Sequence, residues 1–230
     1  MPLPALQLLE KKFEEHIRLL ELKRGAIEKQ IERHFRRFEQ RNRIRLDDEV
    51  RFIRTWMEKP LSIGAVAPSS RVLARAMAAY VDASRNGPII ELGPGTGPVT
   101  EALVAQGVDP SRLILLEYDP AFCRLLRDRY PTSTVVQGDA YSLGRVLGGH
   151  LAAPAAAVVS GLPLFTKPVK MRLKLIHEAF ALMLPGAPFV QFTYATVPPI
   201  PKALDRVRAE ASERIWKNIP PARIWVYRRD

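Results

Sequence analysis

The chain has 230 residues, of which 47% are hydrophobic, so it can bury a sizeable core and is not disordered throughout. Its one cysteine, Cys123, excludes an intramolecular disulfide and a cysteine-based metal cluster. The formal net charge of +11 favours a polyanionic partner, either nucleic acid or an anionic membrane surface, without deciding between them.

Residues 1–45 are predicted to form an amphipathic, basic helix. The segment holds 12 Lys and Arg against 7 Asp and Glu. We expect this helix to bind an anionic membrane, and the alternative is a coiled coil or a lid packed on the core. Its apolar residues recur at helical steps and share one face; they are Leu6, Leu9, Phe13, Ile17, Leu20, Ile27, Ile31, Phe35 and Phe38.

Residues 46–87 are predicted to form a helical lid on the substrate side. A short amphipathic element covers 47–58, and an extended segment follows it. The next helix is expected to begin with Ser69 or Ser70 as its N-cap. Charged residues start at Glu10, so no secretory signal is expected.

From residue 88 onward, strand and helix patterns alternate, which predicts βαβ units and a parallel sheet. Two uncharged stretches, 146–166 and 179–201, are interrupted by Gly and Pro, so neither is predicted to span a membrane. A hairpin of strands 213–217 and 223–228 is expected to close the chain. The other predicted strands are 89–92, 113–117, 134–137, 156–160 and 189–194, and the predicted helices are 99–106, 121–128, 169–184 and 202–209.

A glycine-rich loop follows the first predicted strand of this α/β core. Gly93, Gly95 and Gly97 alternate with other residues, and Glu91 stands at the strand end. Glycines let backbone amides approach a ligand closely, and the next helix offers its positive N-terminus. The spacing differs from the NAD pattern, because the third glycine comes one residue early. It resembles motif I of class I S-adenosylmethionine (SAM)-dependent methyltransferases, and implies that the loop holds the methionine moiety with Glu91 near its ammonium.

Two further acids stand at the ends of the next two strands. Glu117 lies where an acid can accept hydrogen bonds from both ribose hydroxyls. Asp139 lies where the methyltransferases use an acid for the adenine amino group, and the resemblance adds Ala140 and Ser160 to the cofactor residues. The fold expected is therefore a Rossmann-like, seven-stranded class I methyltransferase sheet with a C-terminal antiparallel hairpin, preceded by the amphipathic helix. The expected cofactor is SAM, with S-adenosylhomocysteine as product.

The segment after the fourth strand, Ser160-Gly161-Leu162-Pro163-Leu164-Phe165, stands at the motif IV position. Nucleic-acid amino methyltransferases carry Asn/Asp/Ser-x-Pro-Tyr/Phe there, and the aromatic ring stacks on a planar base. In this chain Leu164 occupies the aromatic place, which disfavours a base as the acceptor.

Methyl transfer is an in-line displacement that needs a neutral, aligned nucleophile and little else, so no catalytic triad and no metal are expected.

Several short segments carry a more specific resemblance. The chain resembles bacterial phospholipid N-methyltransferases, which convert phosphatidylethanolamine to phosphatidylcholine by up to three methylations. For this acceptor, Tyr194 and Tyr141 are predicted as the catalytic residues that line the site and contact the amine, with Trp216 as a third aromatic candidate. Arg71 or Arg223 could donate to the lipid phosphate. The predicted substrate-binding residues are Ser69, Ser70, Arg71, Leu162, Trp216 and Arg223. The matching segments are Ile63-Gly64-Ala65-Val66-Ala67-Pro68-Ser69-Ser70, Glu91 to Gly97, Gly161-Leu162-Pro163-Leu164, Gln191-Phe192-Thr193-Tyr194 and Asn218-Ile219-Pro220-Pro221-Ala222-Arg223-Ile224-Trp225.

The resemblance implies a monomer that acts on a phospholipid, binds an anionic membrane surface through residues 1–45 and binds no nucleic acid. It implies a cytoplasmic protein, peripheral on the cytoplasmic face of the inner membrane. Two alternatives stay open. One is an rRNA or other nucleic-acid adenine amino-methyltransferase, which the positive charge fits. The other is a lipid-binding protein without activity, which the three intact acids disfavour.

Overall fold

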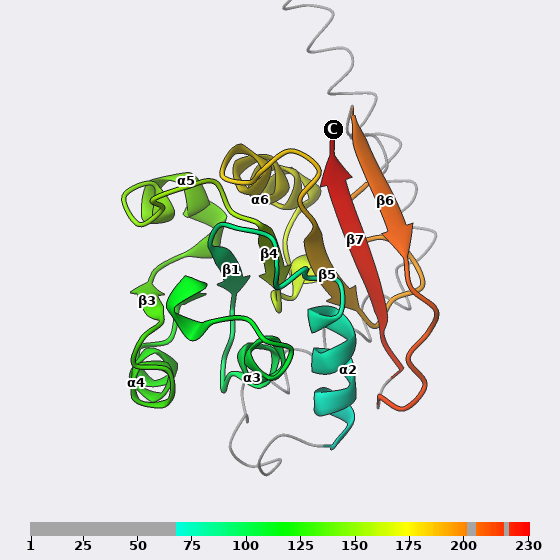
Figure 1. Ribbon diagram of the computed structural model, residues 1–230. Coiled ribbons are helices and arrows are strands. Elements are labelled where there is room, and N and C mark those ends of the chain that lie inside the picture. The colour runs from blue at the N-terminus through cyan, green and yellow to red at the C-terminus, as the bar shows by residue number, and fades with distance from the viewer. Residues whose placement is uncertain (1–67, 202–205, 219–220) are drawn as a thin grey trace, which may run out of the picture. The chain divides into compact units, whose positions relative to one another are not determined.

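The computed structural model describes residues 68–201, 206–218 and 221–230 (Figure 1). The chain divides into two units, Met1–Ile44 and Arg45–Asp230, and every described residue belongs to the second. The amphipathic helix predicted over 1–45 and the short element predicted over 47–58 lie outside the described residues. The domain boundaries at 45 and 87 therefore stay predictions.

The described part of the chain is built around one seven-stranded sheet with the order β3-β2-β1-β4-β5-β7-β6. Strands β1 to β5 are parallel, and β7 runs antiparallel between β5 and β6. The chain reverses direction across the sheet between β1 and β4, where ligands bind in open α/β sheets. The strands are β1 Ile89–Leu92, β2 Leu113–Glu117, β3 Thr134–Gln137, β4 Ala157–Ser160, β5 Phe189–Thr193, β6 Val207–Ala211 and β7 Arg223–Arg229.

Helices cover both faces of the sheet. In Figure 1, α2, α3 and α4 lie below the sheet and α5 and α6 above it. The helices are α2 Pro68–Ala78, α3 Pro98–Ala105, α4 Pro120–Arg129, α5 Leu143–Leu147 and α6 Val169–Ala181, and three 3₁₀ turns are η1 Pro110–Arg112, η2 Ala140–Ser142 and η3 Leu164–Thr166. The N-cap of α4 is Asp119, whose carboxylate accepts from the N–H groups of Ala121 and Phe122.

The alternation of side chains along each strand divides the core into two clusters. Ile90 and Leu92 of β1 face the cluster with α5 and α6, whereas Ile89 faces the cluster with α2 and α3. Both faces of β1, β2 and β4 are therefore buried, which explains why these strands read as nearly continuous apolar runs, whereas the edge strand β3 is only partly buried. Each fully buried Leu, Ile or Val contributes roughly 1.5–3 kcal/mol to the stability of this sheet.

The C-terminal hairpin exists, but its first strand was predicted in the wrong place. The helix predicted over 202–209 is wrong for 207–209, because Val207 begins β6. Val207 and Ala209 pack on the core while Arg208 and Glu210 are exposed, which is the two-residue period of a strand. The strand predicted over 213–217 is also wrong. This segment belongs to the connection to β7, and of its residues Ile215 alone forms an isolated bridge, to Ala222.

Two smaller differences concern the helices. The helix α2 begins at Pro68, so Ser69 and Ser70 lie in its first turn and neither is the N-cap. The short helix α5 was not predicted, because its five residues are too few to show a helical period.

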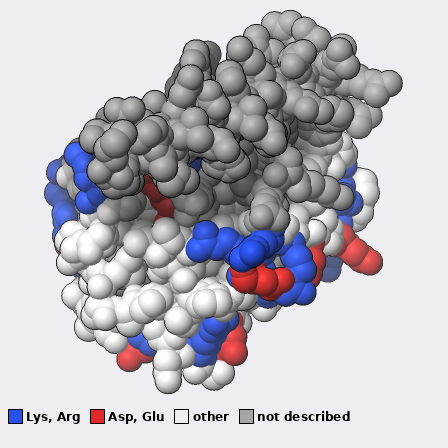
Figure 2. Space-filling model, turned by 90° about the horizontal axis from the view of Figure 1, so that it is seen from above, with Lys and Arg blue, Asp and Glu red and all other residues white. Residues whose placement is uncertain are grey.

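The end of the molecule at which β7 finishes and β6 begins carries charges of both signs (Figure 2). Arg208 and Asp230 form an ion pair of 2.8 Å there.

Among the described residues no helix is long and apolar enough to cross a membrane.

Candidate active site

The glycine loop joins β1 to α3 at the point where the sheet order reverses. Gly93, Gly95 and Gly97 all have positive φ, between 56° and 84°, which residues with a side chain rarely adopt. A Cβ at Gly95 would meet no atom within 4 Å, so the loop presents open space on that side. No side chain caps the first N–H groups of α3, which begins directly after Gly97. These features suit a ligand that approaches the backbone closely.

Glu91 is buried beneath this loop. The Thr100 hydroxyl of α3 donates to its carboxylate at 2.7 Å, so the carboxyl group ties the end of β1 to the first turn of α3. Burial raises the pKa of Glu91 to about 7, although the Thr100 hydrogen bonds act against this, and the nearby Glu117 raises it further. No role was predicted for Thr100 from the sequence. Its position in the first turn after the glycine loop is the only feature of the sequence that could have indicated this contact.

Glu117 at the end of β2 is only 8% exposed and holds the glycine loop from the other side. Its carboxylate accepts from the N–H of Gly95 at 3.0 Å and from the N–H groups of Tyr118 and Asp119 at 2.7 and 2.9 Å. The carboxylate thus uses three of its roughly four acceptor positions on the backbone. This loop-supporting role is additional to the ribose role predicted from its position.

A hollow of about 430 Å³ lies beside Glu117, at the ends of β2 and β3, and is lined by Tyr118, Pro120, Gln137 and Gly138. Tyr118 is 75% exposed there, and sequence reasoning missed it although it directly follows the predicted ribose ligand. Asp139 comes directly after Gly138, which lines the hollow. Its carboxylate accepts from the N–H of Tyr141 at 2.9 Å. The adjacent Ala140 is buried.

The loop after β4 lies directly against the glycine loop. Gly161 donates its N–H to Leu92 at 2.8 Å, and a Cβ at Gly161 would stand 2.8 Å from the carbonyl oxygen of Gly93. A Cβ at Gly93 would in turn stand 2.9 Å from the Leu162 side chain. The two loops therefore touch through their backbones, and Ser160, wholly buried, precedes the contact.

Gln191 of β5 fixes the loop after β4 from below. It is 1% exposed, and its side-chain amide donates to the carbonyl oxygens of Leu162 and Phe192 at 3.0 and 2.8 Å. Gln191 belongs to one of the segments that resemble the phospholipid N-methyltransferases, and the sequence alone predicts no role for it. Its contact with Leu162 makes it a positioning residue for the loop that faces the cofactor motif.

One relative decides the family. The chain is 34% identical over 146 residues, 62% of its length, to the ornithine lipid N-methyltransferase of Singulisphaera acidiphila, and the match covers 76% of that protein. The chain belongs to the lipid N-methyltransferases. It is accordingly a SAM-dependent methyltransferase of the class I type, as the sequence predicted.

Other comparisons agree on the fold and are more limited. A 54-residue stretch, 22% of this chain, is 44% identical to 18% of ribosomal RNA small subunit methyltransferase A from a Synechococcus strain. A TehB-like SAM-dependent methyltransferase from Corynebacterium glutamicum superposes with a TM-score of 0.52 over 80% of this chain and 99% of its own, at 14% identity. No family model matches the chain.

SAM is the cofactor of this methyltransferase, and the loops just described fit it. When bound, SAM supplies an electrophilic methyl group. The open side of Gly95 and the uncapped start of α3 can receive a carboxylate and its backbone contacts, and the hollow beside Tyr118 can receive a flat ring. The individual roles predicted for Glu91, Glu117, Asp139, Ala140 and Ser160 remain predictions.

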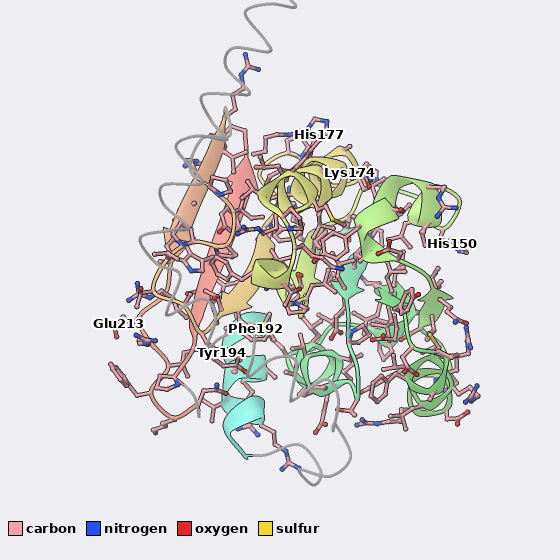
Figure 3. The ribbon with its side chains drawn as sticks, turned by 180° about the vertical axis from the view of Figure 1, so that it is seen from behind. His150, Lys174, His177, Phe192, Tyr194 and Glu213 are labelled. Atoms are coloured by element: carbon pink, nitrogen blue, oxygen red, sulfur yellow. The ribbon has the colours of Figure 1, made fainter. Side chains whose placement is uncertain are left out.

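The two predicted catalytic tyrosines lie on different faces of the sheet. Tyr141 packs with the cluster of α5 and α6, and Tyr194 packs with the cluster of α2 and α3. Burial raises the pKa of the Tyr141 hydroxyl above its ordinary value, and that hydroxyl has no hydrogen-bond partner among the described residues. Tyr194 stands edge-on to Phe192, with ring centroids 5.5 Å apart (Figure 3). A shared contact of both tyrosines with the amine stays a prediction.

The residues predicted to bind substrate are spread along one end of the sheet. Arg71 is exposed on α2, and Leu162 belongs to the loop after β4, with its side chain close to Gly93. Arg223 begins β7 opposite Thr193, so it stands at the end of β5. The side chains of Ser69 and Ser70 lie outside the described residues. Within the described ranges, no group of His, Cys, Asp and Glu is arranged to hold a metal ion.

The buried Glu91 predicts a pH-dependent stability. Its pKa is about 7 in the folded chain against 4.5 in the unfolded chain, so folding favours the protonated form. The contribution is complete below about pH 4.5 and is lost as the pH rises through about 7, by about 3 kcal/mol. We expect the stability of the wild type relative to Glu91→Gln to fall by about this amount between pH 4.5 and 8 in urea titrations. A difference in stability that stays constant over this pH range would contradict the raised pKa of Glu91.

Proposed function

We propose that this methyltransferase transfers methyl groups from SAM to the amino group of phosphatidylethanolamine, and then to the mono- and dimethyl intermediates, to form phosphatidylcholine. The likeness to a lipid N-methyltransferase over 76% of that protein carries this proposal. The acceptor amine must be neutral and lie in line with the methyl group, so the residues around it have to orient the headgroup and exclude water.

Nucleic acid is the less suitable acceptor, because the loop after β4 lacks both groups that bind a base. Gly161 stands where amino methyltransferases of nucleic acids carry Asn, Asp or Ser, and the carbonyl oxygen of Gly93 leaves no room for a Cβ. Leu164 stands at the aromatic place and is 2% exposed, so it belongs to the core. The remaining ring, Phe165, lies under the guanidinium of Arg172 at 5.1 Å.

Several groups suit a zwitterionic headgroup. The Nε of Arg223 is buried and has no hydrogen-bond partner among the described residues, and it stands beside the end of β5. We assign it to the lipid phosphate, together with Arg71. The Tyr141 hydroxyl, also without a partner in the described ranges, and the Tyr194 ring are assigned to the amine, whose quaternary product aromatic faces favour by about 0.5–2 kcal/mol.

The substrate implies that the enzyme works at a membrane surface. We assign residues 1–45 to binding an anionic membrane, by the alternation of apolar and basic residues in their sequence. The enzyme is then peripheral, on the cytoplasmic face of the inner membrane, and acts as a monomer without nucleic acid. An ornithine lipid is the second candidate acceptor, because the relative from Singulisphaera acidiphila is an ornithine lipid N-methyltransferase.

The test is transfer of labelled methyl from SAM to acceptors presented separately. Vesicles of phosphatidylethanolamine and phosphatidylglycerol, vesicles containing ornithine lipid, and extracted RNA are compared at equal enzyme concentration. Label in monomethyl-, dimethyl- and then trimethyl-phosphatidylethanolamine is the expected result. Label in ornithine lipid alone would show that ornithine lipid, and not phosphatidylethanolamine, is the acceptor. Label in RNA alone would overturn the proposal.

A further inference from the structure

Trp216 lies in the connection between β6 and β7 and is 72% exposed. It is one of three large apolar side chains that are exposed in the described part of the chain, and the largest of them; the others are Tyr118 and Leu125. Tryptophan is enriched at protein and membrane interfaces, because its ring has an apolar body and a polar N–H. Tyr118 already lines the hollow beside Glu117, whereas nothing in the site described above covers Trp216.

The chain around Trp216 is firmly held, so the exposure is built into the fold. Ile215 donates to the carbonyl oxygen of Ala222 at 2.7 Å and accepts from the N–H of Asn218 at 3.2 Å. Asn218 is 3% exposed and Ala222 is wholly buried. Ile215 packs on the core cluster that contains α2. The residues on both sides of Trp216 are thus anchored inward while its ring points to solvent.

Cationic side chains accompany the ring. The guanidinium of Arg214 lies 5.6 Å from the centroid of the Trp216 ring and also donates to the carbonyl oxygen of Tyr194 at 3.0 Å. Lys217, the residue that follows Trp216, is exposed. Glu213 is also exposed and points away at the margin of the molecule (Figure 3). An indole flanked by Arg and Lys is the arrangement that favours the interface of a bilayer with anionic headgroups.

The position of this connection suits a lipid surface. Arg214 ties it to Tyr194, which follows directly on β5. In Figures 1 and 3 the connection lies beside α2, at the end of the sheet toward which β1 and β5 point. The glycine loop and the loop after β4 lie at this same end. The opposite end, seen in Figure 2, carries interleaved charges of both signs.

We propose that Trp216 and its flanking Arg214 and Lys217 form a bilayer-docking element, in which the indole enters the headgroup region and the two cations contact anionic lipid. It holds the open end of the sheet against the membrane and acts independently of residues 1–45. This assignment replaces contact with the reacting amine as the role of Trp216, and it rests on the proposed lipid substrate.

The test separates docking from headgroup binding by presenting the acceptor in two forms. The full-length chain and its Trp216→Ala variant are assayed on vesicles of phosphatidylethanolamine and phosphatidylglycerol, and on a short-chain phosphatidylethanolamine kept monomeric. On vesicles we expect the half-saturating lipid concentration to rise about tenfold in Trp216→Ala. On the monomeric lipid, turnover and half-saturation stay unchanged. Leu125→Ala, which removes another exposed apolar side chain, stays at the wild-type value in both forms.

Flotation with the same vesicles gives a readout that needs no activity. The wild type is expected to float with the vesicles and to lose tryptophan fluorescence when brominated lipid is included, and Trp216→Ala to do both less. Equal loss of turnover on vesicles and monomers would assign Trp216 to the headgroup and overturn docking, as would unchanged flotation and quenching. If the wild type methylates neither lipid form, the proposed function fails, while flotation and quenching still decide on docking.

Discussion

Gly161→Ala is expected to lower methyl transfer by about 100-fold or more. The new Cβ would lie 2.8 Å from the carbonyl oxygen of Gly93, a backbone atom that no side-chain rotation can move away. The loop after β4 and the glycine loop must then separate, and a displacement of about 1 Å between reacting groups costs about 100-fold in rate. Steady-state transfer from SAM to lipid vesicles, with the cofactor affinity measured by calorimetry, checks this.

The matched control is Gly149→Ala, because a Cβ at that glycine meets nothing within 4 Å and its φ is not positive. It is expected to retain wild-type activity. Circular dichroism distinguishes a local clash from misfolding, since Gly161→Ala should keep the secondary structure of the wild type. Full activity in a folded Gly161→Ala variant would show that the two loops are not in the contact described here.

Glu117→Ala is expected to weaken SAM binding by roughly 100-fold. A hydrogen bond to a charged group is worth about 1.5–3 kcal/mol, and the change removes the predicted acceptor of the ribose hydroxyls. It also leaves the N–H of Gly95 without its carboxylate partner, so the glycine loop loses a support at the same time. Calorimetry with SAM and S-adenosylhomocysteine measures the affinity, and thermal unfolding measures the accompanying loss of stability.

Asp109→Ala supplies the control for Glu117→Ala. The Asp109 carboxylate also accepts a backbone N–H, that of Ser111 at 2.8 Å, but it precedes β2 and so lies at the other end of the strand. We expect a small loss of stability and no change in cofactor affinity. Equal SAM affinity in wild type and Glu117→Ala would leave Glu117 with its loop-supporting contacts alone.

The parallel half of the sheet could be predicted from sequence because local signals agree there. The strands β1, β2 and β3 have the predicted bounds, since each is a short run enriched in apolar residues that ends at an acid, a glycine or a turn. The N-cap of α4, Asp119, depends on equally local chemistry, because its carboxylate accepts from the next turn of its own chain. The hairpin was misplaced because Val207 to Ala211 forms a half-buried strand whose partner, β7, lies beyond a long connection.

The contacts that organise the site could not be predicted from local patterns. The closeness of Gly161 to Gly93 depends on β1 and β4 being neighbours, which strand order decides and no short motif encodes. The hydrogen bond from Gln191 to Leu162 has the same origin. The two tyrosines were grouped by their chemistry, yet they lie on opposite faces of the sheet because Tyr194 follows β5 and Tyr141 belongs to η2.

The net charge alone does not distinguish a nucleic-acid partner from a membrane, whereas the contacts in the structure bear on this choice. A net charge of +11 fits nucleic acid and membrane equally. The lack of space for a side chain at Gly161, the burial of Leu164 and the exposed Trp216 beside Arg214 together favour a lipid surface.

The most direct measurement is the lipid composition of a cell that makes no phosphatidylcholine of its own and expresses this chain. Thin-layer separation of the extracted lipids is expected to show monomethyl- and dimethyl-phosphatidylethanolamine and phosphatidylcholine, and none of them with Gly161→Ala. An unchanged phosphatidylethanolamine pool in cells that contain the folded wild-type protein would contradict the account.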